Sequence, residues 1–286
     1  MSTRLGHTGE ASAPRFTLVV TCKGRLAHLR QSLPLFMQQP DTRVVVVDYT
    51  CPDGTGAFVE ANFPAAQLVR VPDRPYFNAS AARNAGARLA RSPHLIFCDA
   101  DTILAANFTA LIKPLLTADN FLTFRSASGN SLGGSCVVST KQYQQVRGFD
   151  EVFSGYGGED LDFYWRLSRM GAQRLLCEPT DVIRALEHSP QLRSTHYEVK
   201  DIKRSFLQAR AYRLVKEVIL GLTFVGELPL AQRKKIWSDV AIALNHDCFE
   251  IKVQLPGNTT SGFLNDWTWR REILVRFDRK DIKSNS

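Results

Sequence analysis

The chain has 286 residues, of which 44% are hydrophobic and 22% are charged, as in an ordinary globular protein. This composition excludes a generally disordered chain, a collagen-like fibre and a disulfide-rich miniprotein. Lys and Arg number 36 against 28 Asp and Glu, which gives a formal charge of +8. Such a basic surplus suits anionic partners, among them nucleotides, phosphates, nucleic acid and acidic membrane faces.

Residues 1–14 are polar and are predicted to be flexible, without the apolar core of a signal peptide. No stretch reaches the roughly 18 apolar residues that a membrane helix needs. The six cysteines are widely scattered, lack a Cys-x-x-Cys pair and mostly flank apolar runs. We therefore expect free thiols in a reducing compartment, and a cytoplasmic protein whose only membrane contact would be peripheral, at the inner face.

Short apolar runs alternate with helical patterns through the first two-thirds of the chain. The predicted strands are Phe16–Thr21, Val44–Asp48, Gln67–Val71, Leu95–Cys98, Phe121–Phe124 and Cys136–Ser139. Helical patterns cover 26–36, 79–91 and 161–170, and another begins near Thr55. Because the strand runs are continuous, we expect both faces of a mostly parallel central sheet to be covered by helices. Ligands of such α/β sheets bind beyond the carboxyl ends of the strands.

From about Tyr197 the strand-like runs become rare, and helices are predicted over Arg204–Gly221 and Leu230–Leu244. Residues 196–286 hold 16 Lys and Arg against 11 Asp and Glu, a net charge of +5. We therefore expect an α/β domain over residues 15–195, followed by a mainly helical, basic C-terminal extension over 196–286 that packs on it.

Two carboxylates, Asp99 and Asp101, come directly after the strand Leu95–Cys98. Residues at i and i+2 of an extended chain point the same way, so both carboxylates can meet one divalent cation. Phosphate oxygens would fill the other positions of Mg²⁺ or Mn²⁺. The pattern suits a nucleotide diphosphate, but Asp-x-Asp is common, and a solvated turn after the strand is the alternative.

The segment Gly155–Asp162 reads Gly-Tyr-Gly-Gly-Glu-Asp-Leu-Asp and precedes a helical pattern. Its glycines allow a ligand to approach the backbone closely, and Tyr156 offers a face on which a sugar can stack. Glu159 and Asp160 fall in the first helical turn, where negative charge is favoured. An ionised carboxylate there can remove a proton from an acceptor hydroxyl. The alternative is a loop followed by ordinary acidic residues of a helix start.

In this order, and about 60 residues apart, the two motifs resemble those of nucleotide-sugar-dependent glycosyltransferases with the Rossmann-like GT-A fold. The chain is most similar to family 2 enzymes and to those with a galactosyltransferase-type C-terminal motif, including β-1,4-galactosyltransferases and chondroitin-polymerase-like domains. Their Gly-Trp-Gly-Gly-Glu-Asp motif reads here as Gly155 to Asp160, with Tyr156 in place of the Trp. The resemblance covers roughly Arg15–Pro190.

The resemblance implies where the donor and a divalent cation would bind. Asp101 matches the main ligand of Mn²⁺ or Mg²⁺, Asp99 a ribose contact or a further metal contact, and His188 the third metal ligand. The implied nucleotide-sugar contacts lie near the ends of the first strands or just before Asp-x-Asp, and they are Thr21, Lys23, Arg25, Asp48, Arg83, Asn84, Asp99 and Ala100.

The same resemblance implies that Asp160 is the general base and that Glu159 orients the acceptor. Tyr156, Gly157 and Gly158 would line the acceptor site. The cation and basic groups would stabilise charge on the departing nucleoside diphosphate. A single displacement would then transfer a hexosyl or N-acetylhexosaminyl group from a UDP-sugar, with inversion, to a hydroxyl of a glycan or another acceptor.

Other functions remain open. A retaining transferase of the same fold would keep most of these motifs. A non-catalytic carbohydrate- or membrane-binding relative would be expected to have lost Asp101 or Asp160, and both are present. A nucleotidyltransferase or phosphohydrolase would be expected to carry a Gly-rich phosphate loop, whereas Thr21–Arg25 contains one glycine. No nucleic-acid module is recognisable, so we expect no nucleic-acid partner. The basic extension is expected to contact an acidic acceptor, a partner protein or an anionic membrane surface.

Overall fold

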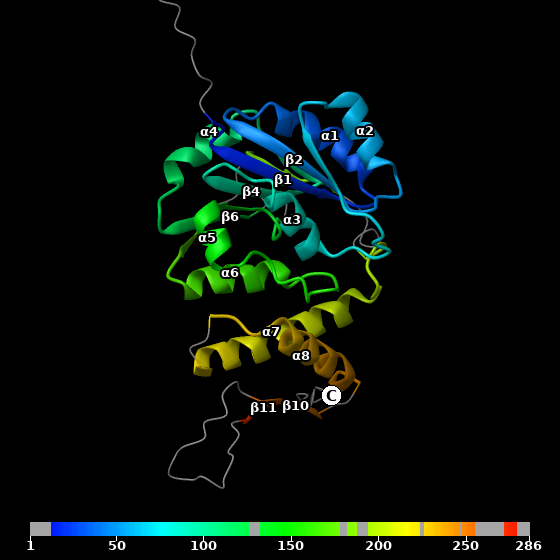
Figure 1. Cartoon of the computed structure of the whole chain (residues 1–286), viewed down its shortest axis with the longest axis vertical. Helices are drawn as coiled ribbons and strands as arrows, with labels where there is room; N and C mark the ends of the chain where they lie inside the picture. The colour runs from blue at the N-terminus through cyan, green and yellow to red at the C-terminus, as the bar shows by residue number, and fades with distance from the viewer. Residues whose placement is uncertain are drawn as a thin grey trace, which may run out of the picture. The chain divides into compact units, whose positions relative to one another are not determined.

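The structure is a computed structural model that describes residues 13–125, 132–177, 182–187, 194–223, 226–245, 248–254 and 272–278. The chain divides into two compact units, each described here by itself (Figure 1). Unit 1 comprises Met1–Phe149 and Phe163–Ser189, and unit 2 comprises Asp150–Asp162 and Pro190–Ser286. The short segment that carries the glycine-acid motif therefore clusters with the C-terminal part of the chain.

Unit 1 is built on a seven-stranded sheet. Its strands are β1 Phe16–Cys22, β2 Thr42–Asp48, β3 Gln67–Arg70, β4 His94–Asp99, β6 Asn120–Phe124, β7 Cys136–Ser139 and β8 Gln173–Cys177. The order across the sheet is β3-β2-β1-β4-β7-β6-β8, and only β7 runs against the others. This confirms the predicted α/β class with a mostly parallel central sheet. Strand β8 was not predicted, because this half-exposed edge strand lacks a continuous apolar run.

The central strand β1 shows why the apolar runs are continuous. Leu18 and Val20 belong to the apolar cluster on one face of the sheet, and Val19 belongs to the cluster on the other face. In register, Thr21 lies opposite Asp99 of β4, and Cys22 lies opposite Asp48 of β2. The polar residues that end these strands therefore meet at the carboxyl edge of the sheet, as the sequence predicts for a ligand site.

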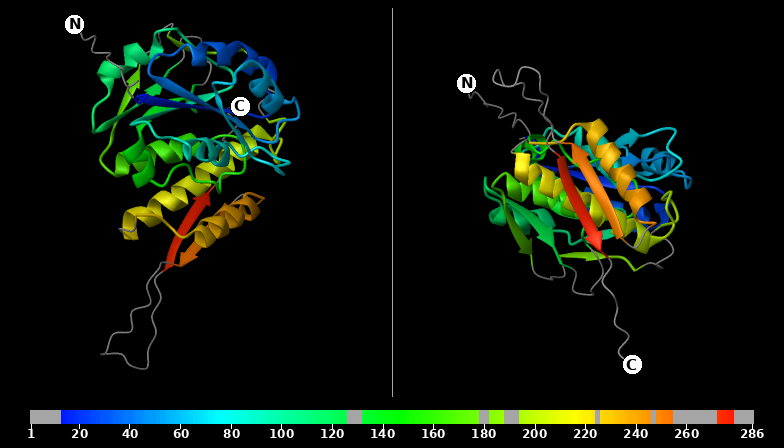
Figure 2. Two further views of the ribbon diagram at one scale, coloured as in Figure 1. Left: turned by 45° about the horizontal axis from the view of Figure 1, so that its top comes forward. Right: turned by 90° about the horizontal axis from the view of Figure 1, so that it is seen from below.

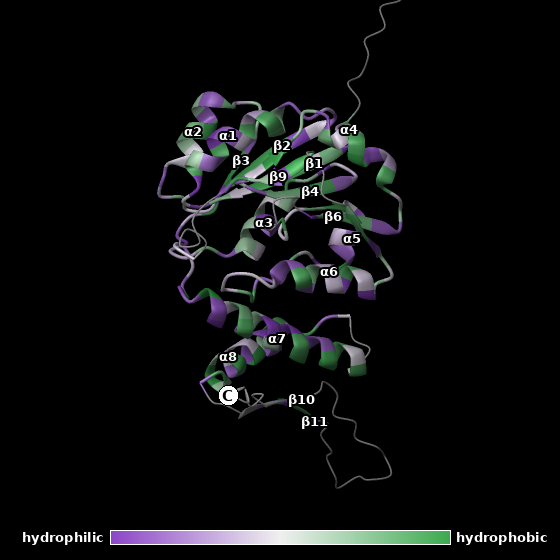
Figure 3. Cartoon of the chain, turned by 180° about the vertical axis from the view of Figure 1, so that it is seen from behind, coloured by the Kyte–Doolittle hydropathy of each residue, from purple (hydrophilic) through white to green (hydrophobic). Residues whose placement is uncertain are grey.

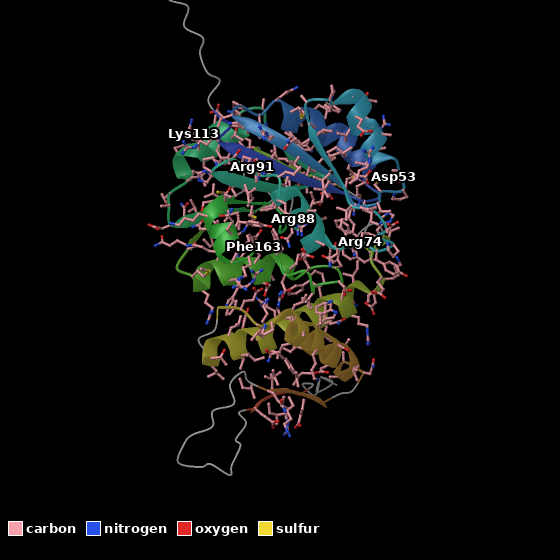
Figure 4. All side chains as sticks on the ribbon, in the orientation of Figure 1. Asp53, Arg74, Arg88, Arg91, Lys113 and Phe163 are labelled. Atoms are coloured by element: carbon pink, nitrogen blue, oxygen red, sulfur yellow. The ribbon has the colours of Figure 1, made fainter. Side chains whose placement is uncertain are left out.

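Helices cover both faces of the sheet (Figures 1 and 3). One face is covered by α1 Leu26–Met37, α2 Thr55–Asn62 and α4 Phe108–Ile112 with the 3₁₀ turn Lys113–Leu115. The other is covered by α3 Ala79–Ala87, α5 Thr140–Gln145 and the part of α6 Glu159–Arg169 that belongs to unit 1. There Phe163, labelled in Figure 4, stacks on Phe149 with 4.2 Å between ring centroids.

A second, two-stranded sheet lies next to the acidic pair. Strand β5 Thr102–Leu104 pairs antiparallel with β9 Ile183–Ala185. Two strands of three residues give too short a pattern to predict, and their pairing joins parts of the chain about 80 residues apart. They bring the segment after Ala185 back to Asp101, since the Leu186 N–H donates to the Asp101 carbonyl at 2.7 Å.

Helix α3 packs unusually close to the sheet because its inner face is made of small residues. A side-chain carbon at Gly86 would lie 2.4 Å from Val19 Cγ1 and 2.8 Å from Val47 Cγ2. The Asn78 side chain accepts from the Ala81 N–H at 2.8 Å and caps the helix start. This close approach determines how near the polar residues of α3 lie to the carboxyl edge of the sheet.

Unit 2 contains the two predicted helices and one strand pair. They are α7 Ile202–Thr223, α8 Leu230–Ala243, β10 Cys248–Gln254 and β11 Glu272–Asp278. The antiparallel pair β10 and β11 lies along α8 (Figure 2). The extension was expected to be mainly helical, and this pair was not predicted, although β10 alternates buried Ile251 and Val253 with polar residues, which is the pattern of a half-buried strand. Among the described residues, no helix is both long and apolar enough to cross a membrane.

The packing of α3 predicts that Gly86→Ala lowers the free energy of unfolding. The added methyl group overlaps Val19 and Val47, and overpacking of this kind costs about 1–3 kcal/mol. The matched control is Gly221→Ala in α7, where an added carbon meets nothing within 4 Å. We expect the control to be neutral or to stabilise by up to about 1 kcal/mol, since alanine favours helix. Urea denaturation measures both, and equal effects would contradict the packing argument.

Candidate active site

The backbone of the acidic triplet Asp99-Ala100-Asp101 is fastened from two sides. The Ser32 hydroxyl of α1 donates to the Ala100 carbonyl at 2.7 Å, and the Leu186 N–H donates to the Asp101 carbonyl at the same distance. Ala100 is buried, so this residue serves as the anchor between the two acids. The triplet therefore presents both carboxylates from a rigid strand end.

Asp99 pairs with an arginine that α3 brings to the carboxyl edge. Arg83 Nη2 donates to Asp99 Oδ1 at 3.0 Å, and the guanidinium carbon lies 5.3 Å from the centre of the Phe149 ring. The Arg83 side chain is 3% exposed, whereas that of Asp99 is 43% exposed. A side-chain carbon at Gly134 would lie 2.2 Å from Arg83 Nη2, so glycine leaves the room that this ion pair occupies.

Asp101 pairs with Arg25, which stands directly before α1. Arg25 Nη1 donates to Asp101 Oδ2 at 3.1 Å, and both side chains are 17% exposed. Each carboxylate of the acidic triplet thus faces one guanidinium. The carboxyl edge of unit 1 therefore holds two carboxylates, a group that attracts cations, and two guanidiniums, a group that can bind phosphate in a bidentate manner.

The two carboxylates fit a hard divalent cation that shares its coordination sphere with a ligand. Asp99 and Asp101 supply oxygen donors, which Mg²⁺ and Mn²⁺ prefer. In the described part of the chain, no three His, Cys, Asp or Glu side chains converge to hold a metal on their own. The third predicted ligand, His188, lies outside the described residues.

The loops after β1 and β2 are tied together by Lys23. Its Nζ donates to the carbonyls of Tyr49, Thr50 and Arg74 at 3.1, 3.0 and 2.7 Å. Burial lowers the Lys23 pKa, and the negative charges of Cys51 and Asp48 offset part of that effect. With three carbonyl acceptors, the ammonium group braces these loops from inside the protein.

Asp48 has a comparable bracing role at the end of β2. Its Oδ1 accepts from the Cys51 N–H and its Oδ2 from the Gly56 N–H, both at 2.8 Å. These contacts hold the turn before α2. A carboxylate has more than two acceptor sites, so Asp48 keeps the capacity to accept from a further donor.

Asn84 joins α3 to the end of the first of the two chain segments that form unit 1. Its Nδ2 donates to the Phe149 carbonyl at 2.9 Å, and its Oδ1 accepts from the Phe149 N–H at 2.9 Å and from the Tyr143 hydroxyl at 2.7 Å. Both ends of the amide are engaged within the protein. Thr21 is likewise buried in β1, 4% exposed. These two residues support the edge rather than project from it.

In unit 2, helix α7 explains the glycines of the Gly-Tyr-Gly-Gly loop. Gly157 and Gly158 have φ of +81° and +93°, which favours glycine. A side-chain carbon would lie 2.6 Å from Phe206 at the first position and 2.7 Å from Ala209 Cβ at the second. The sequence suggested that the glycines make room for a ligand. In the structure they make room for α7.

Tyr156 stands in an aromatic cluster of unit 2. Its ring meets those of Tyr197 and Phe206 edge-on, with centroids 5.7 and 5.4 Å apart. Phe206 is 41% exposed, so the cluster reaches the surface of this unit. Aromatic rings at a surface are the groups on which sugar rings stack.

Three acids occupy the first turn of α6, and they differ in exposure. Asp162 is fully buried, Glu159 is 8% exposed, and Asp160 is partly exposed. Negative charge is favourable there because the helix N-terminus carries partial positive charge. Of the three, Asp160 is the carboxylate most accessible to a partner in solution.

The buried acid Asp162 belongs to an ion network that sequence reasoning missed. Lys216 of α7 contacts Asp162 Oδ1 at 2.5 Å and Asp150 Oδ2 at 2.7 Å, and all three side chains are 0% exposed. Asp150 also accepts from the Tyr212 hydroxyl at 2.7 Å and pairs with Arg233 of α8 at 2.5 Å. The two ends of the segment Asp150–Asp162 are thus paired with one ammonium group.

The electrostatics of this network follow from its charges. Burial alone would raise the Asp150 pKa, but Lys216 and Arg233 more than offset this and hold the pKa well below its usual value. Burial and the Asp150 charge raise the Tyr212 pKa.

The sequence contains a signal of this network: Lys216 stands beside Val215 and four residues after Tyr212, on the apolar side of a predicted helix. Charged residues are rarely buried there unless paired.

This network also accounts for part of the basic surplus. Lys216 and Arg233 belong to the C-terminal extension with net charge +5, and they neutralise Asp150 and Asp162, which precede it. Two of its sixteen basic residues therefore act as internal counter-ions. Contact of the remainder with an acidic acceptor, a partner or a membrane stays a prediction.

Two family profiles match overlapping parts of the chain. Residues 17–132 match glycosyl transferase family 2, and residues 113–189 match the profile described as N-terminal domain of galactosyltransferase. The first match contains the acidic triplet and its two arginines, and the second contains the segment Gly155–Asp162. No curated protein sequence matches the chain.

Solved structures with a similar fold share little sequence with the chain. The mannosyltransferase PcManGT from Pyrobaculum calidifontis, in complex with GDP-Man and Mn²⁺, is 20% identical, with a TM-score of 0.53 over 81% of this chain and 70% of that one. S. aureus TarS 1-349, in complex with UDP-GlcNAc, is 16% identical, with a TM-score of 0.56 over 80% and 72% of the two chains. At these identities the similarity shows the fold alone.

The sheet, the acidic strand end and the family profiles together define a glycosyltransferase of the GT-A fold. Within that class, one part of the chain matches the family 2 profile and a later part matches the galactosyltransferase profile. The resemblance inferred from the two sequence motifs is thereby confirmed.

The ion network predicts that Lys216→Met destabilises the protein strongly. The substitution leaves two buried carboxylates without their cation, and breaking a buried pair in this way costs about 3–5 kcal/mol. The matched control is Lys235→Met, since Lys235 pairs with Asp239 at 2.6 Å but is 70% exposed. The control should cost less than about 1 kcal/mol. Urea denaturation of both variants decides, and equal losses would contradict the network's role.

Proposed function

We propose that the chain transfers a sugar from a UDP-sugar to an acceptor hydroxyl with inversion, in a reaction that depends on a divalent cation. The observation that carries this proposal is the pairing of Asp99 with Arg83 and of Asp101 with Arg25 at the carboxyl edge of unit 1. Two carboxylates beside two guanidiniums suit a ligand that is both a polyanion and a metal chelate. A nucleoside diphosphate is such a ligand.

On the donor side, the arginines would bind diphosphate oxygens through charge-assisted hydrogen bonds. Asp101, Asp99 and His188 would hold Mn²⁺ or Mg²⁺, which when bound stabilises the charge that develops on the leaving group. The position of Leu186 supports the inclusion of His188, because its N–H donates to the Asp101 carbonyl two residues before the histidine.

The remaining donor residues would act mainly as supports. Asp48 retains acceptor capacity for a ribose hydroxyl, while Lys23 and Asn84 hold the loops and α3 in place. Thr21 and Ala100 fix the ends of β1 and β4. Solved structures of the same fold hold GDP-Man or UDP-GlcNAc, and we extend a nucleotide-sugar donor to this chain, with a hexosyl or N-acetylhexosaminyl group transferred.

On the acceptor side, we assign Asp160 as the general base and Glu159 as the residue that orients the acceptor. The accessibility of Asp160 supports this choice, since Asp162 is buried and committed to Lys216. Asp160 would take the proton of the attacking hydroxyl, which displaces the nucleoside diphosphate from the opposite face of the anomeric carbon. Tyr156 would offer an aromatic face, on a loop that Gly157 and Gly158 shape.

Donor binding is expected to require both a divalent cation and Asp101. A panel of nucleotide sugars with Mn²⁺ should show a UDP-sugar raising the melting temperature, and at a hundred times Kd the gain is about 2.7 kcal/mol. Asp101→Ala or a chelator should abolish the gain. Asp119→Ala, an exposed acid just before β6, is the control and should keep it. Binding that needs neither the metal nor Asp101 would overturn this site.

Asp160→Asn is expected to separate binding from transfer. The amide preserves size but cannot accept the proton, and loss of a general base lowers the rate by about 10²-fold or more. Release of UDP in the presence of acceptor measures transfer, and the thermal shift measures donor binding, which should persist. Glu198→Gln, an exposed acid of unit 2, is the control. Unchanged transfer would remove Asp160 from the role.

A further inference from the structure

Two cysteines meet beneath the loops that follow β1 and β2. Cys22 is the last residue of β1 and is 1% exposed, whereas Cys51 lies in the turn after β2 and is half-buried. Both are free thiols. Because β1 and β2 pair in parallel, with Cys22 opposite Asp48, the turn after β2 returns Cys51 to the end of β1.

The contacts of the two sulfur atoms differ. The Gly24 N–H donates to Cys51 Sγ at 3.1 Å, and Cys22 Sγ lies within hydrogen-bond distance of the Thr55 hydroxyl, at 3.2 Å. Cys51 packs against the buried apolar cluster that contains Cys22, and Cys22 is the neighbour with the largest effect on the Cys51 pKa. Cys51 is therefore an acceptor surrounded by donors, which is an environment that stabilises a thiolate.

The acidities follow from this arrangement. The Cys22 side chain is the main cause that lowers the Cys51 pKa to about 5, helped by Thr55 and by the backbone N–H groups of Asp53 and Gly24. The Cys51 side chain, together with burial, raises the Cys22 pKa well above its usual value. Cys51 is therefore the more acidic thiol of the pair.

We propose that Cys51 and Cys22 form an oxidation-sensitive dithiol, in which Cys51 is the reactive sulfur and Cys22 resolves it into a disulfide. The role of each follows from access and contact. A peroxide can reach the half-buried Cys51, while the buried Cys22 can meet only the sulfur beside it. Cytosolic disulfides of this transient type serve redox responses rather than stability.

The chemistry balances with a hydroperoxide as the oxidant. The Cys51 thiolate attacks the peroxide oxygen, the O–O bond breaks, and the products are a sulfenic acid and, after protonation of the leaving oxygen, water or an alcohol. The Cys22 sulfur then attacks the sulfenic sulfur, and a second water leaves as the S–S bond forms. Two thiols are oxidised and one peroxide is reduced, and a small dithiol reverses the change.

The disulfide would act on the donor side of the site, an effect that depends on the proposed function. Cys51 contributes negative charge beside the Lys23 ammonium, and its sulfur is the acceptor for Gly24. Oxidation removes the charge and weakens the acceptor. The loop Lys23–Arg25 would shift, and it carries the guanidinium that pairs with Asp101. Asp53 and Arg74, labelled in Figure 4, lie near this edge of unit 1.

Mass spectrometry of the full chain tests the dithiol without reference to activity. Hydrogen peroxide should remove two hydrogen atoms and yield one Cys22–Cys51 linked peptide, and dithiothreitol should restore the mass. Cys22→Ser should stop at a Cys51 sulfenic acid that dimedone traps, and Cys51→Ser should give neither product. Cys177→Ser, a third half-buried thiol, is the control and should behave as wild type. Failure of the linked peptide to form would overturn the proposal.

Alkylation of the unmodified protein gives a second test that needs no variant. Iodoacetamide should label Cys51 at a rate that is half-maximal near pH 5 and flat above it, because the thiolate is the reacting form. Burial raises the Cys177 pKa, so that cysteine should react only in alkaline solution. A Cys51 profile that rises with that of Cys177 would overturn the assignment of Cys51 as the reactive sulfur.

A comparison of the oxidised and the reduced protein tests whether the disulfide weakens donor binding. With Mn²⁺ present, oxidation should weaken UDP-sugar binding by about tenfold, equivalent to 1.4 kcal/mol, and Cys22→Ser treated with peroxide and then dithiothreitol should bind as before. Equal affinities of the disulfide and dithiol forms would overturn the link. If the reduced protein binds no nucleotide sugar, the proposed function fails, while the linked peptide still decides the dithiol.

Discussion

The buried ammonium group of Lys216 determines how the segment Asp150–Asp162 is held within unit 2. Lys216 is fully buried between Asp150 and Asp162, the first and last residues of the segment Asp150–Asp162. A buried charge is tolerated only when it is paired, so both acids have to lie in the interior beside Lys216. The segment between them therefore begins and ends in the interior of unit 2. Between them, the positive φ angles of Gly157 and Gly158 and their contacts with α7 leave little freedom. The partly exposed Asp160 therefore lies between glycines that pack on α7 and an acid that is paired with Lys216.

The fold of unit 1 is readable from sequence to the extent that it depends on local patterns. Continuous apolar runs such as Val44–Asp48 indicate strands covered on both faces, and the structure confirms them. The antiparallel direction of β7 and the pairing of β5 with β9 depend on residues distant in the chain, which no local pattern encodes. The strand β10, exposed on one side, does carry the alternating pattern of such strands and could have been predicted from it.

The sequence predicts which types of residue form the candidate site better than it predicts the contacts between them. The motifs point to Asp99, Asp101 and Asp160, and to arginines near the first two. What the sequence does not reveal is that each arginine faces one of the acids, or that the polar ends of Lys23 and Asn84 are already bound within the protein. These pairings are set by how closely α3 and the strand loops approach, a property of three-dimensional packing.

The contact between α7 and the glycine loop has a practical meaning for how the chain can be shortened. The family profiles end at residue 189, which invites the idea that the enzyme ends there. Yet the cation that neutralises Asp150 and Asp162, and the helix surface against which Gly157 and Gly158 lie, come later in the chain. A fragment cut at the profile boundary would keep every motif residue and lose the support of the acid-bearing loop. The compact unit that holds the glycine loop therefore extends beyond the part of the chain that the family profiles match.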